Sequence, residues 1–166
     1  KMYLENSKTI IVKIGSSLII DDKKIIRKKW LLEFAKDIKT LKKKNKNIII
    51  VSSGAIALGC KKLNIAKKKL KIDQSQAVAS VGQIELMNLF KEIFAIQKIN
   101  ISQILLTLED TEIRRRAINA KRTIENLFNL NFLPIVNEND TIATSEIKYG
   151  DNDRLASRVA QISDAD

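Results

Sequence analysis

Residues 48–59, with the sequence IIIVSSGAIALG, predict a buried β-strand that turns directly into an α-helix. The four β-branched residues at the start form the strand, a Ser-Ser-Gly turn follows, and the helix begins at Ala55. An earlier segment begins in the same way, because the β-branched run Thr9–Ile14 stops at a Gly-Ser-Ser turn. Strands that are apolar along their whole length are typical of a parallel sheet covered by helices on both faces.

The rest of the chain continues this alternation of strands and helices. Two further strands are predicted over Ile101–Leu106 and Phe132–Val136, and Pro134 restricts the second to a strand start or a bulge. The spacing of apolar residues predicts helices over residues 30–41, 77–94, 111–130 and from 151 onward. The last of these helices is expected to have an acidic N-cap, and residues 141–148 are expected to form a hairpin. The pattern predicts an α/β domain whose ligands bind beyond the carboxyl ends of the strands.

Length and charge narrow the classes of protein. A chain of 166 residues with 45% hydrophobic content fits one domain or part of one. The net charge of +11 raises the alternative of a non-catalytic, nucleic-acid-binding protein. The lysines, however, come in scattered runs such as 42–44 and 67–69, without aromatic-studded strands, zinc spacing or a recognition helix. We therefore interpret them as a solvated surface and do not expect nucleic-acid binding.

The rare residue types limit the available chemistry. Cys60 is the single cysteine, so no disulfide can form within this chain, and there is no histidine for Ser-His-Asp or Cys-His catalysis. No apolar run has the length of a signal peptide or of a membrane span. We expect a cytoplasmic protein without a membrane segment, whose chemistry depends on lysine, carboxylates, amides and backbone groups.

A first candidate site lies at the end of the first predicted strand. Lys13 stands inside the apolar strand, and the turn Gly15-Ser16 follows it. A buried lysine is costly unless it is paired, and glycine lets backbone N–H groups approach an anion closely. The pair of features indicates contact with phosphate. The alternative is a lysine that reaches solvent from the strand end.

A second candidate site is the turn after the strand 48–51. Ser53 and its neighbours offer hydroxyls and free N–H groups to a carboxylate or phosphate at the start of a helix. The alternative is simple N-capping of that helix by Ser52 or Ser53.

A third candidate site combines residues 137–140, Asn-Glu-Asn-Asp, with residues 149–153, Tyr-Gly-Asp-Asn-Asp. Residues 137–166 carry seven acids and three bases, a local charge of −4, whereas the rest of the chain carries +15. Acids here suit a substrate ammonium, and amide N–H groups suit carboxylates, so the two clusters could hold both ends of an amino acid. A solvated, turn-rich hairpin is the alternative.

Taken in order, these segments resemble the amino acid kinase family from residue 9 to the C-terminus. The resemblance rests on IIVKIGSS (10–17), VSSGAIALG (51–59), QAVASVGQ (76–83), QILLT (103–107), NAKRTI (119–124), PIVNENDTIAT (134–144) and EIKYGDNDRLAS (146–157). The combination of VNEND and GDND is more specific than any single motif, and it resembles the members that phosphorylate glutamate. The resemblance implies a three-layer αβα sandwich with a mainly parallel sheet.

The resemblance also implies roles for individual residues. Lys13 corresponds to the family lysine that stabilises the transferring phosphoryl group, with Gly15 and Ser16 beside it on the ATP side. Asp153 corresponds to an aspartate that organises catalytic lysines. The implied glutamate-binding residues are Ser53, Asp140 and Asn152, with Asn137 and Asp151 as neighbouring supports.

The implied reaction is ATP-dependent phosphorylation of the γ-carboxylate of L-glutamate to glutamyl 5-phosphate, the first step toward proline. Mg²⁺, proline as feedback inhibitor and a homo-oligomer accompany it in the family. The reaction does not require histidine, because the attacking carboxylate is already ionised at pH 7.

The family pattern continues beyond Asp166 with a further strand, a second catalytic lysine and a glycine-rich loop. Residues 1–8 precede the start of the resemblance, and we expect them to be an N-terminal extension. Residues 9–166 would be the glutamate-binding part of the kinase domain, lacking most of the ATP site and inactive alone. The alternatives are the kinase part of a bifunctional pyrroline-carboxylate synthase, a family member acting on acetylglutamate, aspartate or uridylate, and a non-catalytic remnant.

Overall fold

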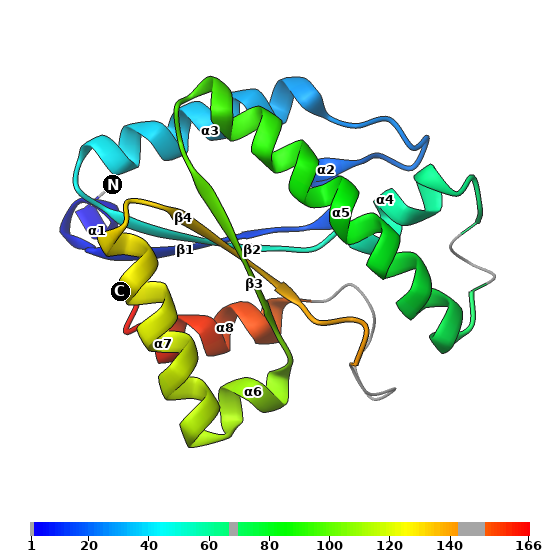
Figure 1. The fold of residues 1–166 in the computed structure, drawn as a ribbon. Helices are drawn as coiled ribbons and strands as arrows, with labels where there is room; N and C mark the ends of the chain where they lie inside the picture. The colour runs from blue at the N-terminus through cyan, green and yellow to red at the C-terminus, as the bar shows by residue number, and fades with distance from the viewer. Residues whose placement is uncertain (1, 67–69, 143–151) are drawn as a thin grey trace.

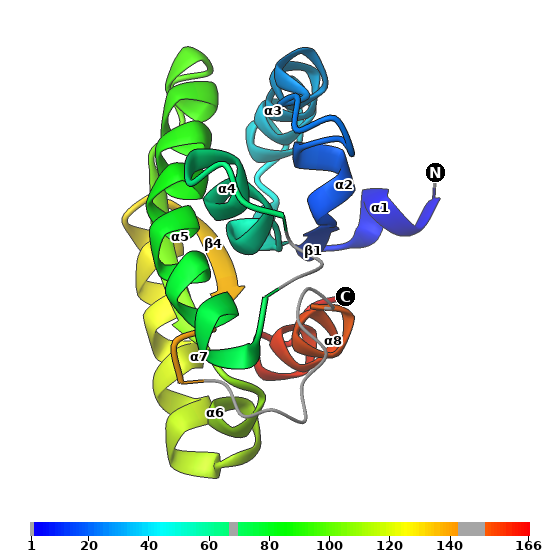
Figure 2. The same cartoon turned by 90° about the vertical axis from the view of Figure 1, so that its right-hand side faces the viewer.

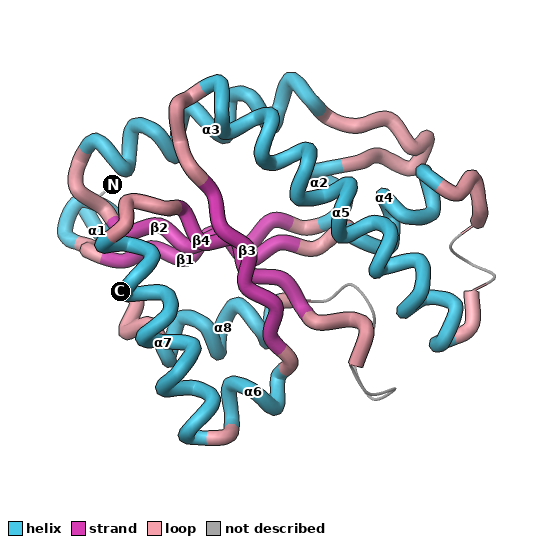
Figure 3. The backbone as a smooth tube through the Cα atoms, viewed as in Figure 1, coloured by secondary structure: helices cyan, strands magenta, loops and turns pink. Residues whose placement is uncertain are grey.

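One parallel sheet forms the centre of the molecule. The structure, a computed structural model, describes residues 2–66, 70–142 and 152–166. The described strands lie in the order β1-β2-β4-β3 and are all parallel. Figure 3 shows them in magenta at the centre of the molecule. Their bounds are Thr9–Ile14 (β1), Asn47–Ser52 (β2), Ile101–Leu106 (β3) and Leu133–Glu138 (β4). The four strands predicted from β-branched runs are thus confirmed.

Helices cover both faces of this sheet, as Figures 1 and 2 show. The described helices are α1 (Met2–Asn6), α2 (Ser16–Ile19), α3 (Lys28–Lys43), α4 (Ala55–Lys62), α5 (Ile72–Ile96), α6 (Leu108–Glu112), α7 (Arg114–Asn129) and α8 (Asp153–Ile162). Helices α3, α4 and α5 lie on one face, and α6, α7 and α8 lie on the other. The predicted α/β class and the three-layer αβα sandwich are confirmed. Within the described residues, no helix is both long and apolar enough to cross a membrane.

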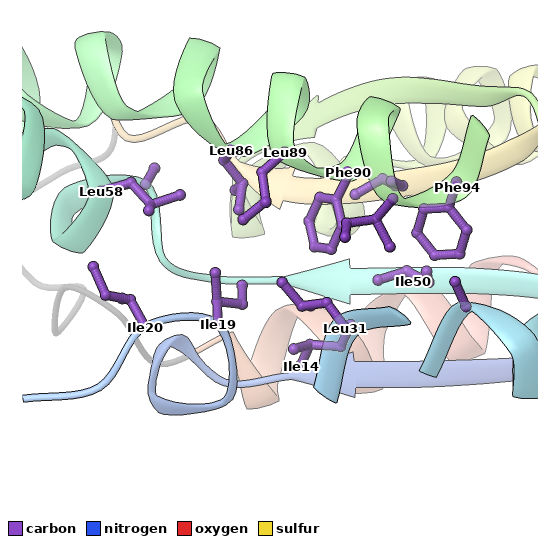
Figure 4. Packing of buried hydrophobic residues seen from close by; sticks show 14 of the residues in the cluster. Ile14, Ile19, Ile20, Leu31, Ile50, Leu58, Leu86, Leu89, Phe90 and Phe94 are labelled. Atoms are coloured by element: carbon purple, nitrogen blue, oxygen red, sulfur yellow. The ribbon is translucent and has the colours of Figure 1, made fainter. Parts of the chain in front are cut away.

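The two faces of the sheet carry separate hydrophobic cores because side chains alternate along a strand. In β2, Ile48 and Ile50 pack toward α3 and α5, whereas Ile49 and Val51 pack toward α7 and α8. Phe90 of α5 is fully buried in the same core cluster as Ile50, and both are labelled in Figure 4. This two-sided burial explains why the strand has no polar position between residues 48 and 51.

The order of the strands creates a crevice at their carboxyl ends. The chain passes from β1 to β2 through α3 and from β2 to β3 through α5, on one face, and returns from β3 to β4 through α7 on the other. Crossovers between parallel strands are right-handed, so a reversal of direction along the sheet moves the connecting helix to the opposite face. The next described helices after the neighbouring strands β2 and β4 are α4 and α8, which lie on opposite faces. Ligands bind at such switch points.

Three local predictions needed correction or lie outside the structure. The single helix predicted over residues 111–130 is wrong, because the chain leaves helical geometry at Ile113 and forms α6 and α7 instead. The acidic N-cap predicted for the last helix is also wrong, because Asn152 occupies that position. The predicted hairpin lies outside the described residues beyond Ile142. Pro134 does stand near a strand start, since β4 begins at Leu133.

Two glycines bring α4 and α5 into backbone contact. A Cβ atom added at Gly59 would lie 2.2 Å from the carbonyl oxygen of Val78, and one added at Gly82 would lie 1.7 Å from that of Ala55. Real Cβ atoms do not approach backbone oxygen this closely, so only glycine allows the two helices to pack at this distance. The contact fixes the height of the N-terminal end of α4 over the sheet.

We expect Gly82→Ala to lower the unfolding free energy by about 3 kcal/mol, because the overlap is with a backbone atom and exceeds the gain in helix propensity of about 1 kcal/mol. Urea denaturation of the purified protein measures this change. Gly15→Ala is the matched control, since its Cβ would have no neighbour closer than 3.8 Å. Equal stability of the two variants would contradict the glycine contact.

Candidate active site

A pocket lies at the carboxyl ends of the central strands, where the crevice is expected. Its lining comes from four segments of the chain. The residues are Ser16 of α2, Ser53 and Gly54 after β2, Ala55, Ile56 and Ala57 of α4, Asn137 and Asp140 at and after β4, and Asn152 before α8. The structure thus brings five predicted site residues into one pocket. Asp151, the remaining predicted support, lies outside the described residues.

The turn between β2 and α4 presents backbone N–H groups to this pocket. Gly54 is the N-cap of α4 and has φ 115°, which a residue with a side chain rarely adopts. The N-capping alternative is wrong, because the Ser52 hydroxyl donates to the Ser53 carbonyl and the Ser53 hydroxyl donates to the Ile14 carbonyl at 3.3 Å. The first N–H groups of a helix have no partner within the helix. The first turn of α4 therefore suits a carboxylate or phosphate.

The side-chain amides of Gln83, Asn137 and Asn152 form a hydrogen-bonded chain, and the last two of them line the pocket. Asn137 Nδ2 donates to Gln83 Oε1 at 2.8 Å, and Asn152 Nδ2 donates to Asn137 Oδ1 at 2.8 Å and to the Ser52 carbonyl. The Glu138 N–H also donates to Asn137 Oδ1, at 2.9 Å. Sequence reasoning missed Gln83 as a site residue, and the only signal was its place in the segment QAVASVGQ.

The direction of these bonds corrects one expectation about Asn152. Both of its amide hydrogens are directed to protein oxygens, on Ser52 and Asn137, so the side chain offers its Oδ1 as an acceptor. Asn152 is therefore suited to an ammonium group. The amide N–H groups predicted to receive a carboxylate are not those of Asn152, and the backbone N–H groups of α4 are better placed for that role.

Two carboxyl groups lie at the end of β4, Glu138 as its last residue and Asp140 two residues later, and burial acts on both. Burial, together with the charge of nearby Asp140, raises the pKa of Glu138 to about 7, and burial raises the pKa of Asp140 to about 6. Glu138 is 5% exposed, and its Oε1 has no hydrogen-bond partner within the part of the chain that the structure describes. Asp140 lines the pocket, so its charge at neutral pH faces any ligand there.

Glu138 is expected to make stability fall as pH rises. The folded pKa of about 7 exceeds the ordinary value of 4.5, so the native state binds more protons between these values and loses stability through that window. Glutamine does not titrate, so we expect Glu138→Gln to remove this loss. The unfolding free energy of the variant, relative to that of wild type, should be about 2 kcal/mol higher at pH 8 than at pH 5. Urea denaturation at both pH values measures it. Glu92→Gln, at an exposed position of α5, is the control, and an equal gain there would contradict the assignment.

Lys13 and Asp153 form an ion pair beside the pocket. Lys13 Nζ lies 2.7 Å from Asp153 Oδ1, which joins the carboxyl end of β1 to the first turn of α8. The lysine is not buried as the apolar strand suggested, because β1 is an outer strand of the described sheet and the side chain remains 31% exposed. A Cβ added at Gly15 would lie 3.8 Å from Lys13 Nζ, so the Gly15 backbone adjoins the ammonium.

Comparison with known proteins agrees with the fold and the motifs. The model of the amino acid kinase family matches residues 8–166, and the chain belongs to the amino acid kinase family. Two solved structures of carbamate kinase from Giardia, one of them bound to AMP-PNP, align with TM-scores of 0.64 at 14% and 13% identity. They cover 96% and 98% of this chain, which covers 71% and 72% of theirs. At such low identity, this likeness shows the shared fold.

Among the curated relatives, those with high identity are called glutamate 5-kinase. The chain is 79% identical over 165 residues to the glutamate 5-kinase of Pelagibacter ubique (strain HTCC1062), and 50% identical over 164 residues to that of Ruegeria sp. (strain TM1040). These alignments cover 99% and 98% of this chain but 45% of each relative. The chain thus spans less than half the length of these relatives.

Proposed function

We propose that this chain is the glutamate-binding part of a glutamate 5-kinase, which phosphorylates the γ-carboxylate of L-glutamate with ATP to give glutamyl 5-phosphate, the first step of proline biosynthesis. The observation that carries the proposal is a pocket with donors on one wall and acceptors on the other. The helix N-terminus of α4 supplies the donors, and Asp140 and Asn152 supply the acceptors. The 79% identity to a glutamate 5-kinase supports the substrate.

In this proposal each wall of the pocket binds one end of the amino acid. The N–H groups at the start of α4 receive the α-carboxylate, because the helix dipole and the free donors both favour an anion there. The Asp140 carboxylate and the Asn152 Oδ1 receive the α-ammonium. Ser53 keeps its hydroxyl oxygen available as an acceptor while its hydrogen bonds to the Ile14 carbonyl. The γ-carboxylate is then the group left to react.

The reaction needs positioning and neutralisation of charge more than a proton acceptor. A γ-carboxylate oxygen forms a bond to the γ-phosphorus of ATP, the bond from that phosphorus to the bridging oxygen breaks, and ADP leaves. Lys13 neutralises charge on the transferring group, and Asp153 holds the lysine in place. The Gly15 backbone beside the ammonium and the hydroxyl of Ser16 fit the phosphate side. Mg²⁺, when bound through the phosphates, would screen their charge.

Other parts of the proposal rest on the family and its relatives. We propose a cytoplasmic homo-oligomer that proline inhibits by binding at or near the glutamate pocket. Nucleic-acid binding is not part of the proposal, because the predicted site residues line a small pocket and the lysines of residues 42–44 are not among its lining residues.

The test is an acceptor panel with the protein encoded by the complete reading frame that contains this chain. ADP release would be measured with ATP, Mg²⁺ and either glutamate, aspartate, N-acetylglutamate, carbamate or uridylate. Hydroxylamine would trap the acyl phosphate as a hydroxamate. Glutamate-dependent ADP release with formation of the γ-hydroxamate is the expected result. Turnover with another acceptor and none with glutamate would contradict the substrate while keeping the family.

A further inference from the structure

Gln83 lies one hydrogen bond away from the pocket. It stands on α5 next to Gly82, the glycine that brings the backbone of α5 against Ala55 at the start of α4. Its Oε1 accepts from Asn137 Nδ2 at 2.8 Å. Its Nε2 is buried and has no hydrogen-bond partner among the described residues. The side chain is thus committed to Asn137 through its oxygen.

Backbone groups fix the direction of the whole amide chain. The Glu138 N–H can only donate, so the Asn137 atom that faces it is the oxygen. The Ser52 carbonyl can only accept, so the Asn152 atom that faces it is the nitrogen. The Nδ2 of Asn137 therefore faces Gln83, and Gln83 accepts this hydrogen bond through its Oε1. With both backbone groups satisfied in this way, only an acceptor at position 83 can pair with Asn137 Nδ2.

We propose that Gln83 is a positioning residue for substrate binding. By accepting from Asn137 it holds the amide that receives Asn152, and it thereby keeps the Asn152 Oδ1 directed to the substrate ammonium. This role rests on the proposed function, because it concerns recognition of the amino group of glutamate.

Loss of the acceptor at position 83 is expected to affect binding of the substrate amino group and not of its carboxylates. Without an acceptor at position 83, Asn137 Nδ2 loses a partner in a buried region, and the amide chain loses the bond that orients it. The ammonium site at Asn152 is then less well formed, whereas the N–H groups of α4 and the Lys13–Asp153 pair are not part of the chain. Binding of the amino group is expected to weaken while the chemical step is unchanged.

The experiment compares Gln83→Met with Gln83→Glu in the protein from the complete reading frame. Methionine removes the acceptor, and glutamate keeps an oxygen for Asn137 Nδ2 but has no amide N–H. We expect Gln83→Met to raise the KM for glutamate about tenfold, the equivalent of one hydrogen bond, with kcat within twofold of wild type. Gln83→Glu is expected to recover a KM within threefold of wild type.

A second readout separates this role from a general loss of structure. Glutarate has the two carboxylates of glutamate but no amino group, and its inhibition constant against glutamate is expected to change less than twofold in Gln83→Met. Gln97→Met, just after the other end of α5, is the matched control and should leave both constants unchanged.

The outcomes distinguish the two proposals. Wild-type protein without glutamate-dependent turnover would contradict the proposed function itself. Wild-type turnover with an unchanged KM in Gln83→Met would overturn the role of Gln83 alone. Equal losses in Gln83→Met and Gln83→Glu would overturn it too, since they would show that the amide N–H, and not the acceptor, matters. A weakened inhibition by glutarate would do the same.

Discussion

Replacing Lys13 with methionine is expected to lower kcat by about 10²–10³-fold, with the KM for glutamate within about threefold of wild type. The reason is that a fixed positive charge aimed at developing negative charge acts in the transition state, and removing one such group costs a factor of this size. Lys13 is held in place by Asp153 at 2.7 Å, so it does not have to be ordered during the reaction. Initial rates at saturating ATP and varied glutamate measure both constants.

Two controls accompany this prediction. Lys62→Met removes the same charge from an exposed lysine paired with Glu85 at 3.1 Å, and it should leave kcat unchanged. Asp153→Asn should lower kcat less than Lys13→Met, because the ammonium remains while its anchor is weakened. If Lys13→Met raised the KM for glutamate and spared kcat, the lysine would belong to substrate binding and not to phosphoryl transfer.

Asp140→Asn is expected to raise the KM for glutamate by about 10 to 100-fold, because a charge-assisted hydrogen bond to an ammonium contributes about 1.5–3 kcal/mol. The wild-type KM should also depend on pH. Burial raises the pKa of Asp140 to about 6, and only the ionised form attracts the ammonium. The KM is therefore expected to rise about tenfold as the pH falls from 8 to 5, with a midpoint near 6.

The variant provides the control for the pH effect. Asparagine does not titrate, so the KM of Asp140→Asn should be flat over the same range. Asp37→Asn, at an exposed position of α3, should keep the wild-type profile. A KM that falls as the pH is lowered would have the wrong sign for an ionised partner of the ammonium, and it would contradict the assignment.

The fold could be predicted from the sequence because its strongest signals are local. Runs such as Ile48 to Val51 are β-branched and end at small turn residues, so each strand is visible by itself, and apolar character on both faces implies a parallel sheet. The break at Ile113 was not visible, because Ile113 leaves helical geometry with ψ 111° and no glycine or proline marks the position. The exposure of Lys13 depends on β1 being an outer strand, which is a property of strand order.

The sequence allowed the grouping of the candidate residues in one pocket to be predicted, but not the direction of the hydrogen bonds between them. Ser53, Asn137, Asp140 and Asn152 share a pocket because parallel strands place their carboxyl ends along one edge. The orientation of each amide depends on bonds between residues far apart in sequence, such as Asn152 to Ser52 across 100 positions. Composition and spacing carry no such information. The same reason hid Gln83, which bonds to Asn137 across 54 positions.

The glycine contact between α4 and α5 limits how a pocket of this kind can evolve. Gly82 leaves no room between the two backbones, so α4 cannot be moved outward or inward by exchanging a side chain at the contact. The start of α4, where the proposed function places the substrate carboxylate, is thus held against the backbone of α5. New substrate preferences would have to arise on the wall formed by β4 and the start of α8, one side chain at a time. One side of the pocket is thus positioned by contact between backbones, and the other side is formed by side chains that can be exchanged.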